Sequence, residues 1–191
     1  VLQDADIERT AAALTWGAFA NCGQVCASVE RVLVHRSVLT QLLDKLTPQV
    51  AALRPGDPTQ DPMIQIGPVN NRRQRDIVEG LVNDAVTKGA KIVLGGSVHE
   101  GPGNFFDPTI LVDVTSNMDI ANTETFGPVL PLMVFDDEEE MIAEANRSHL
   151  GLLAYVFSKD ATRSQRIAER IEAGTVMIND VLSTHGMPET P

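Results

Sequence analysis

The residues best suited to chemistry lie in one short run, FANCGQVCASVER, which spans residues 19–31. Cys26 follows Gly23 by three residues, and glycine and asparagine are the residues that allow a chain to turn sharply. A thiol beyond such a bend is a candidate nucleophile, because backbone N–H groups beside it can stabilise a developing oxyanion. The spacing therefore makes Cys26 the principal candidate for an attacking thiolate.

The chain has one other cysteine, Cys22, which lies inside the same bend. We predict that Cys22 is structural and buried, because lone cysteines in soluble domains usually behave as small hydrophobic residues. The same packing role is the alternative interpretation of Cys26. Two cysteines without a neighbouring Cys or His cluster predict neither a zinc site nor a disulfide framework, so we expect a reducing compartment, the cytoplasm.

Composition limits the possible classes of protein. The chain has 191 residues, of which 43% are hydrophobic, and a formal net charge of −11. This length suits one α/β domain. The acidic balance argues against nucleic acid as a partner, since phosphate binding needs a basic face. No apolar run approaches the ~20 residues that span a bilayer, and the first residues do not resemble a signal peptide, so we expect no membrane segment.

The elements that must position Cys26 alternate along the chain. Helical patterns are expected at about residues 7–18, 37–53, 71–88, 136–148 and 161–172, with Ser37 as the N-cap of the second. Strand patterns are expected at about residues 29–35, 91–94, 109–112, 129–135, 154–157 and 175–179. This alternation predicts an α/β fold with a largely parallel sheet and crossover helices. The acidic run 136–140 is predicted to be a solvated helix start and not a metal site.

Two motifs resemble those of the aldehyde dehydrogenase family. The pattern F-x-N-x-G-Q-x-C-x-x-x-x-R at residues 19–31 resembles the family's nucleophile motif, and ETFGP at residues 124–128 resembles its E-x-F-G-P motif. Further stretches match in the expected order: residues 66–69, 89–96, 104–109, 149–152 and 174–179. The resemblance covers essentially all 191 residues and implies the family's three-layer α/β catalytic domain.

The resemblance implies a role for several residues. Cys26 would attack an aldehyde to give a thiohemiacetal, whose oxyanion the Cys26 amide would help to hold, and a thioester would then be hydrolysed to the acid. Glu124 would bind the ribose hydroxyls beside the nicotinamide of NAD or NADP, and Phe126 would pack near the ring. A carboxylate that accepts two vicinal hydroxyl hydrogens suits ribose recognition. Asn21 and Gln24 are expected to shape the turn.

The resemblance also implies that residues 1–191 are a fragment. The family's cofactor-binding domain, with its general-base glutamate and oxyanion asparagine, would lie outside it, as would a C-terminal segment used in oligomerisation. Gln74 is expected near the cofactor. We therefore expect the 191 residues alone to be inactive, and the whole protein to be a homo-oligomer that acts on a small-molecule aldehyde.

Two other functions remain open from the residues themselves. A thiol hydrolase or acyltransferase would pair Cys26 with His35, His99, His149 or His185, and would require an imidazole about 3–4 Å from the thiol. A non-catalytic interaction domain would keep Cys26 buried and slow to react.

Overall fold

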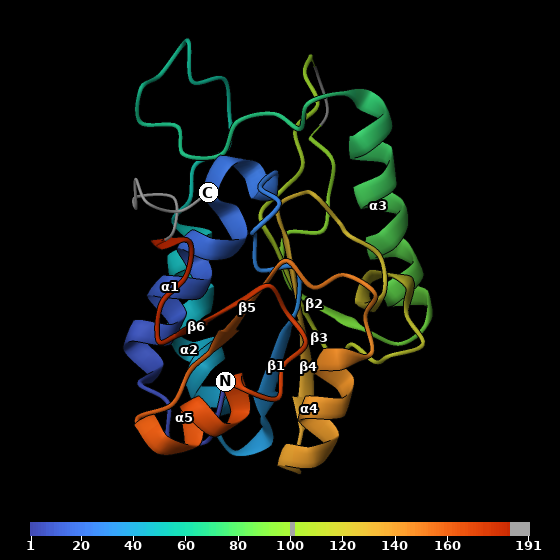
Figure 1. Ribbon diagram of the computed structural model, residues 1–191. Coiled ribbons are helices and arrows are strands. Elements are labelled where there is room, and N and C mark those ends of the chain that lie inside the picture. Colours follow the sequence, from blue (N-terminus) through green and yellow to red (C-terminus); the bar gives the residue numbers. More distant parts are fainter. Residues whose placement is uncertain (100–101, 184–191) are drawn as a thin grey trace.

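The computed structural model describes residues 1–99 and 102–183 and has three layers, with helices on both faces of a central sheet (Figure 1). The sheet has the strand order β1, β4, β3, β2. These strands are Val32–His35 (β1), Lys91–Leu94 (β2), Thr109–Val112 (β3) and Val129–Phe135 (β4). The predicted α/β class is therefore confirmed.

Strand β4 is the centre of this sheet. It pairs in parallel with β1 and with β3, whereas β2 is antiparallel to β3 at the edge. Six of its seven residues are buried. A strand covered on both faces needs such a nearly continuous apolar run, which is why its bounds are those that the sequence predicted.

The last two strands form a separate parallel pair, β5 (Leu153–Val156) and β6 (Thr175–Ile178). The first two residues of the chain lie between this pair and the main sheet. The N–H of Leu2 donates to the carbonyl of Phe157, and the N–H of His35 donates to the carbonyl of Val1, both at 3.0 Å. The strands thus form two sheets where the sequence predicted one.

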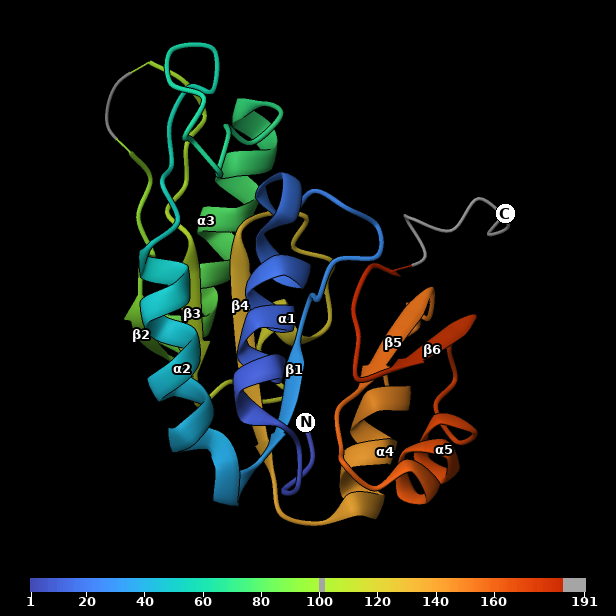
Figure 2. The same cartoon turned by 90° about the vertical axis from the view of Figure 1, so that its left-hand side faces the viewer.

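In the residues that the structure describes, five α-helices cover the strands. Helices α1 (Ile7–Phe19) and α2 (Leu39–Ala51) pack against each other on one face of the main sheet, and α3 (Arg72–Thr87) and α4 (Glu138–Asn146) lie on the other (Figures 1 and 2). Helix α5 (Ala161–Ala168) packs on β5 and β6. Short 3₁₀ turns are η1 (Ala20–Gly23), η2 (Arg36–Val38) and η3 (Asp119–Ala121). None of the helices in the described part is long and apolar enough to cross a membrane.

Helix starts follow the expected capping chemistry, with one exception. Asp6, Asn71 and Asp137 each accept a hydrogen bond from a backbone N–H in the first turn of α1, α3 and α4. The prediction for Ser37 is wrong. Residue Ser37 lies in η2, where its N–H donates to Nδ1 of His35, and α2 begins only at Leu39.

Candidate active site

The bend before Cys26 consists of three consecutive residues in the left-handed region. Asn21, Cys22 and Gly23 have φ values of 50°, 61° and 68°. A left-handed conformation costs a non-glycine residue about 1–2 kcal/mol, so tertiary contacts must hold this bend. The side chain of Asn21 donates to the carbonyl of Gln24 at 3.0 Å, and Oε1 of Gln24 accepts from the N–H of Asn70 at 2.8 Å. These two residues shape the turn as predicted.

The two cysteines of this segment, which we call the Cys26 turn (residues 20–28), have opposite environments. Cys22 is buried, and desolvation raises the pKa of its thiol to about 12, so it is inert at neutral pH. Cys26 is exposed. A hydrogen bond from the N–H of Ser28 to the carbonyl of Val25, at 2.8 Å, closes a turn with Cys26 at its second position. Within residues 1–99 and 102–183 the Cys26 N–H has no hydrogen-bond acceptor.

The Cys26 turn touches the second predicted motif directly. A Cβ atom on Gly23 would overlap the carbonyl group of Gly127, so the two backbones approach as closely as only glycine allows. Gly127 in turn packs against the side chain of Val78 on α3. The fold therefore joins two motifs that lie about one hundred residues apart in the sequence.

The second motif lies in a segment that we call the Glu124 loop (residues 123–128). Glu124 is exposed, and Phe126 has a left-handed backbone with φ of 47°. The N–H groups of Thr125 and Phe126 donate to the two carboxyl oxygens of Glu30, at 2.8 and 3.3 Å. Gln74 donates to the carbonyl of Thr125 at 2.8 Å. Gln74 thus supports the backbone of this loop.

Glu30 was not among the predicted site residues, although it is the one acidic residue of the run 19–31. Its carboxyl group is largely buried, and desolvation raises its pKa to about 7 despite the two backbone hydrogen bonds. An acidic residue directly before a strand, next to Val29, was the available signal. Its partners lie 95 and 96 residues further along the chain, and nothing in the local sequence points to them.

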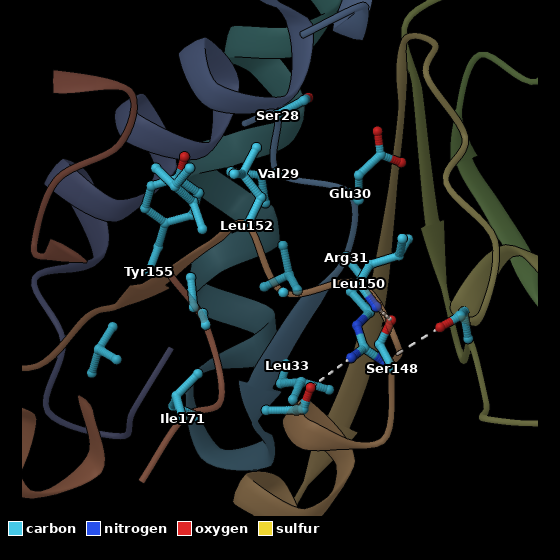
Figure 3. A pocket seen from close by; sticks show the side chains of 18 of the residues that line it. Ser28, Val29, Glu30, Arg31, Leu33, Ser148, Leu150, Leu152, Tyr155 and Ile171 are labelled. Carbon is cyan, nitrogen blue, oxygen red and sulfur yellow. Dashed lines mark hydrogen bonds between the residues drawn. The ribbon is translucent and has the colours of Figure 1, made fainter. Parts of the chain in front are cut away.

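A cavity of about 340 Å³ lies between β1 and β5 and reaches the Cys26 turn (Figure 3). Cys26, Glu124, Glu30 and Tyr155 line it, together with apolar residues of the two facing strand edges. Phe126 does not line this cavity. It lies in a separate hollow beside Asn21 and Gln24. The structure thus brings Cys26 and Glu124 to one cavity and places Phe126 on another side of the same loop.

Tyr155 connects β5 to the Cys26 turn. Its hydroxyl group donates to the carbonyl of Ala27 at 2.6 Å. Burial raises the pKa of Tyr155 to about 12, so the hydroxyl remains a donor at neutral pH. Tyr155 was not among the predicted site residues either, because its partner is 128 residues away.

The described histidines lie elsewhere. His35 contacts Ser37 and the ring of Phe135, and His99 bonds Asp107. None of His35, His99 and His149 lines the cavity or bonds the Cys26 thiol. His185 lies outside the described residues. These three histidines therefore do not form the Cys–His pair that a thiol hydrolase requires. Cys26 is exposed, whereas the interpretation as a non-catalytic interaction domain requires a buried thiol.

The acidic run 136–140 forms ion pairs and a helix cap. Asp137 caps α4, Glu138 pairs with Arg163, and Glu139 pairs with Arg170. In the part of the chain that the structure describes, no group of three or more His, Cys, Asp or Glu side chains is placed to hold a metal ion.

Comparison with known proteins identifies close relatives. The NADP(+) succinate-semialdehyde dehydrogenase of Escherichia coli is 41% identical over 179 residues, and betaine aldehyde dehydrogenase 1 of Rhizobium meliloti is 41% identical over 182 residues. Each match covers 94% of this chain and 37% of the relative. The crystal structure of an NAD-dependent aldehyde dehydrogenase from Sinorhizobium meliloti matches with a TM-score of 0.90 and 32% identity, over 95% of this chain and 36% of that one.

The chain thus spans little more than a third of the length of these relatives. The sequence profile of the aldehyde dehydrogenase family matches residues 1–191. The family match includes both the Cys26 turn and the Glu124 loop, and the chain belongs to the aldehyde dehydrogenase family.

Proposed function

We propose that the whole protein oxidises an aldehyde to a carboxylic acid with NAD or NADP, and that Cys26 is its nucleophile. The observation that carries the proposal is an exposed thiol on a strained turn that contacts the Glu124 loop. The family membership supports it, since the relatives are NAD(P)-dependent aldehyde dehydrogenases.

The proposed chemistry begins at the sulfur of Cys26. The thiolate attacks the carbonyl carbon, a C–S bond forms, and the carbonyl electron pair moves to oxygen. The free N–H of Cys26 donates to this oxyanion, which lowers the barrier because the donor is already in place. A nicotinamide cofactor bound at the Glu124 loop would supply the acceptor for the hydride of that carbon, and Cys26 would then carry a thioester. Water then cleaves the C–S bond, releasing the acid and the thiol.

The Glu124 loop offers groups that fit the cofactor. The Glu124 side chain is exposed at the cavity that Cys26 lines, and it has no hydrogen-bond partner within the described ranges. Its two oxygens are therefore free to accept from the vicinal hydroxyls of a ribose. Phe126, two residues further along the chain, lines the separate hollow beside Asn21 and Gln24 and offers an apolar surface for the ring. We propose Glu124 and Phe126 as cofactor-binding residues on this basis.

We further propose that residues 1–191 form part of a catalytic domain within a cytoplasmic homo-oligomer. Two free cysteines are consistent with a reducing compartment. Exposed apolar side chains, Trp16 at 62% and Leu152 at 54%, are consistent with surfaces that another domain or subunit covers. The net charge of −11 argues against nucleic acid as a partner.

The test is substitution of Cys26 in a protein of the relatives' full length that contains this chain. Cys26→Ala and Cys26→Ser should each lower kcat for aldehyde oxidation by at least about a thousandfold, because the covalent step is lost. Cys22→Ala should retain turnover, since that thiol is buried and inert. Turnover by Cys26→Ser near the unsubstituted rate would contradict the proposal. Turnover by the 191 residues alone would overturn the expectation that they are inactive without the rest of the protein.

A further inference from the structure

One carboxyl group connects the two proposed halves of the site. Glu30 lies four residues after Cys26, on the segment that leads from the thiol into β1. Its two oxygens accept from consecutive N–H groups of the Glu124 loop, on Thr125 and Phe126. Paired acceptance of this kind fixes both the distance and the orientation of a peptide segment, because each oxygen has its own donor.

The segment that Glu30 holds is strained. Phe126 adopts a left-handed conformation, which a bulky residue keeps only when its surroundings determine it. On the other side of the loop, Gln74 of α3 donates to the carbonyls of Thr125 and Phe126. The N–H groups of the two residues are thus held from the Cys26 segment, and their carbonyl groups from α3.

The charges around Glu30 leave its carboxyl group available for the loop. Arg31 follows it in the sequence, but the Arg31 guanidinium points away from the Glu30 carboxyl group (Figure 3) and bonds Glu144 and the carbonyls of Ala121 and Ala145. Glu124 raises the pKa of Glu30 by repulsion and is the charged neighbour on the loop. Cys26, Tyr155, Glu172 and the N-terminal residue Val1 are the other residues with titratable groups that line the same cavity.

The hydroxyl group of Thr125 is a second unusual feature of this part of the loop. Thr125 is fully buried, and its Oγ1 atom has no hydrogen-bond partner among the described residues. Its side chain is among the groups that lower the pKa of Glu30. A buried hydroxyl group without a partner is rare, and this one belongs to the residue whose N–H donates to Glu30.

We propose that Glu30 is a positioning residue, which fixes the Glu124 loop, and with it the cofactor-binding groups, relative to the thiol of Cys26. The inference rests on the proposed function for the roles of Glu124 and Phe126. The two hydrogen bonds from the Glu124 loop to Glu30 lie within these 191 residues, so they can be tested without measuring turnover.

The first experiment measures amide hydrogen exchange by NMR in the 191-residue chain. In Glu30→Ala, the amides of Thr125 and Phe126 should exchange about tenfold faster than in the unsubstituted chain, because both acceptors are lost. Amides of β4 should exchange at unchanged rates. Glu140→Gln, at an exposed glutamate on α4, is the matched control and should alter neither set. If Glu30→Ala does not fold, the isosteric Glu30→Gln decides, with faster exchange expected at one of the two amides.

The second experiment measures kinetics in a protein of the relatives' full length that contains this chain. Glu30→Gln should raise KM for the nicotinamide cofactor about tenfold, while KM for the aldehyde and the rate of Cys26 alkylation by iodoacetamide stay within about threefold. If Glu30 only stabilised the fold, the KM for the cofactor would not change more than the KM for the aldehyde and the alkylation rate. Unchanged exchange at the amides of Thr125 and Phe126 would overturn the claim that Glu30 fixes the Glu124 loop. Altered exchange with an unchanged cofactor KM would overturn the positioning role. Failure of the proposed function would be seen in a different result, namely turnover by Cys26→Ser.

Discussion

Gly23 meets two demands that no other residue type meets together. Its backbone is left-handed, with φ of 68°, and the position of its missing Cβ is taken by the carbonyl group of Gly127. A side chain there would have to displace the backbone of the Glu124 loop and not the flexible end of a side chain. The contact between the Cys26 turn and the Glu124 loop therefore depends on this one glycine.

We predict that Gly23→Ala lowers the free energy of unfolding by about 3 kcal/mol, from the combined costs of a left-handed alanine and of backbone overlap. Urea unfolding of the 191-residue chain measures this. The control is Gly80→Ala on α3, where a Cβ atom would meet nothing within 4 Å. Because alanine is the better helix former, that variant should gain about 0.5–1 kcal/mol. Equal stability of the two variants would contradict the assignment of Gly23.

Single residues were predictable where the signal is local. The motif predicted a reachable Cys26 after a bend, and the usual burial of lone cysteines predicted a buried Cys22; the structure has Cys26 exposed and Cys22 buried. Glu30 and Tyr155 were not predicted, because their partners are far along the chain and become neighbours only after the sheets form. A sequence shows that a glutamate is present but not that its carboxyl group turns inward.

At the scale of elements, helix bounds were predictable where caps and apolar stripes agree, and strand bounds where β-branched or apolar runs end at turn residues. Strands β2, β3 and β4 have their predicted bounds, whereas β1 begins at Val32 and not at Val29. The reason is tertiary, since the N–H of Val29 donates to the carbonyl of Gly17 on α1, at 3.0 Å. Helix α5 also ends four residues earlier than predicted, at Ala168.

Arg31 connects β1 to the end of α4 and to η3. Its guanidinium donates to the carbonyls of Ala121, Glu144 and Ala145, and pairs with the Glu144 carboxylate at 3.3 Å. Its side chain is only 17% exposed. The planar fork of arginine suits several fixed carbonyl acceptors at once, which the point charge of lysine does not.

We predict that Arg31→Met destabilises the chain by about 3 kcal/mol, because buried carbonyl groups and one carboxylate lose their donor. Arg31→Lys should recover less than half of this loss. The control is Arg36→Met, which removes an exposed ion pair with Asp136 and should cost about 1 kcal/mol or less. The measurement is chemical denaturation of the three variants in parallel. Similar losses for Arg31→Met and Arg36→Met would contradict the structural role of Arg31.

At the scale of the whole molecule, the α/β class followed from the alternation of elements, but the arrangement of the strands did not. The antiparallel edge strand β2 and the separate β5–β6 pair depend on which edges meet, and local patterns do not encode that. Contacts between distant segments complete the arrangement. The carboxylate of Asp4, for example, accepts from the hydroxyl of Ser158 and from the N–H groups of Lys159 and Asp160.

The stability of the whole chain should depend on pH through several groups of opposite sign. Hydrogen bonds from Lys88 and Arg36 lower the pKa values of Asp84 and Asp136, so these carboxylates stabilise the fold above about pH 4 and lose that effect as the pH falls. Burial lowers the pKa of the Val1 amino group to about 5, so stability from this group rises between pH 5 and 8. Glu30 acts in the other direction.

The pKa of Glu30 is raised from 4.5 to about 7, so the folded chain binds its proton more tightly than the unfolded chain does. Its contribution to the free energy of unfolding must therefore fall as the pH rises from about 4.5 to 7. The glutamine of Glu30→Gln does not titrate. The pH-dependent contributions of Asp84, Asp136 and Val1 are common to both chains and cancel in the difference. We predict that the free energy of unfolding of Glu30→Gln, minus that of the unsubstituted chain, rises by about 2 kcal/mol between pH 5 and pH 8. Urea unfolding at four pH values measures this, with Glu140→Gln giving a flat difference as the control. A flat difference for Glu30→Gln as well would mean that the Glu30 carboxyl group is as well solvated in the fold as in the unfolded chain.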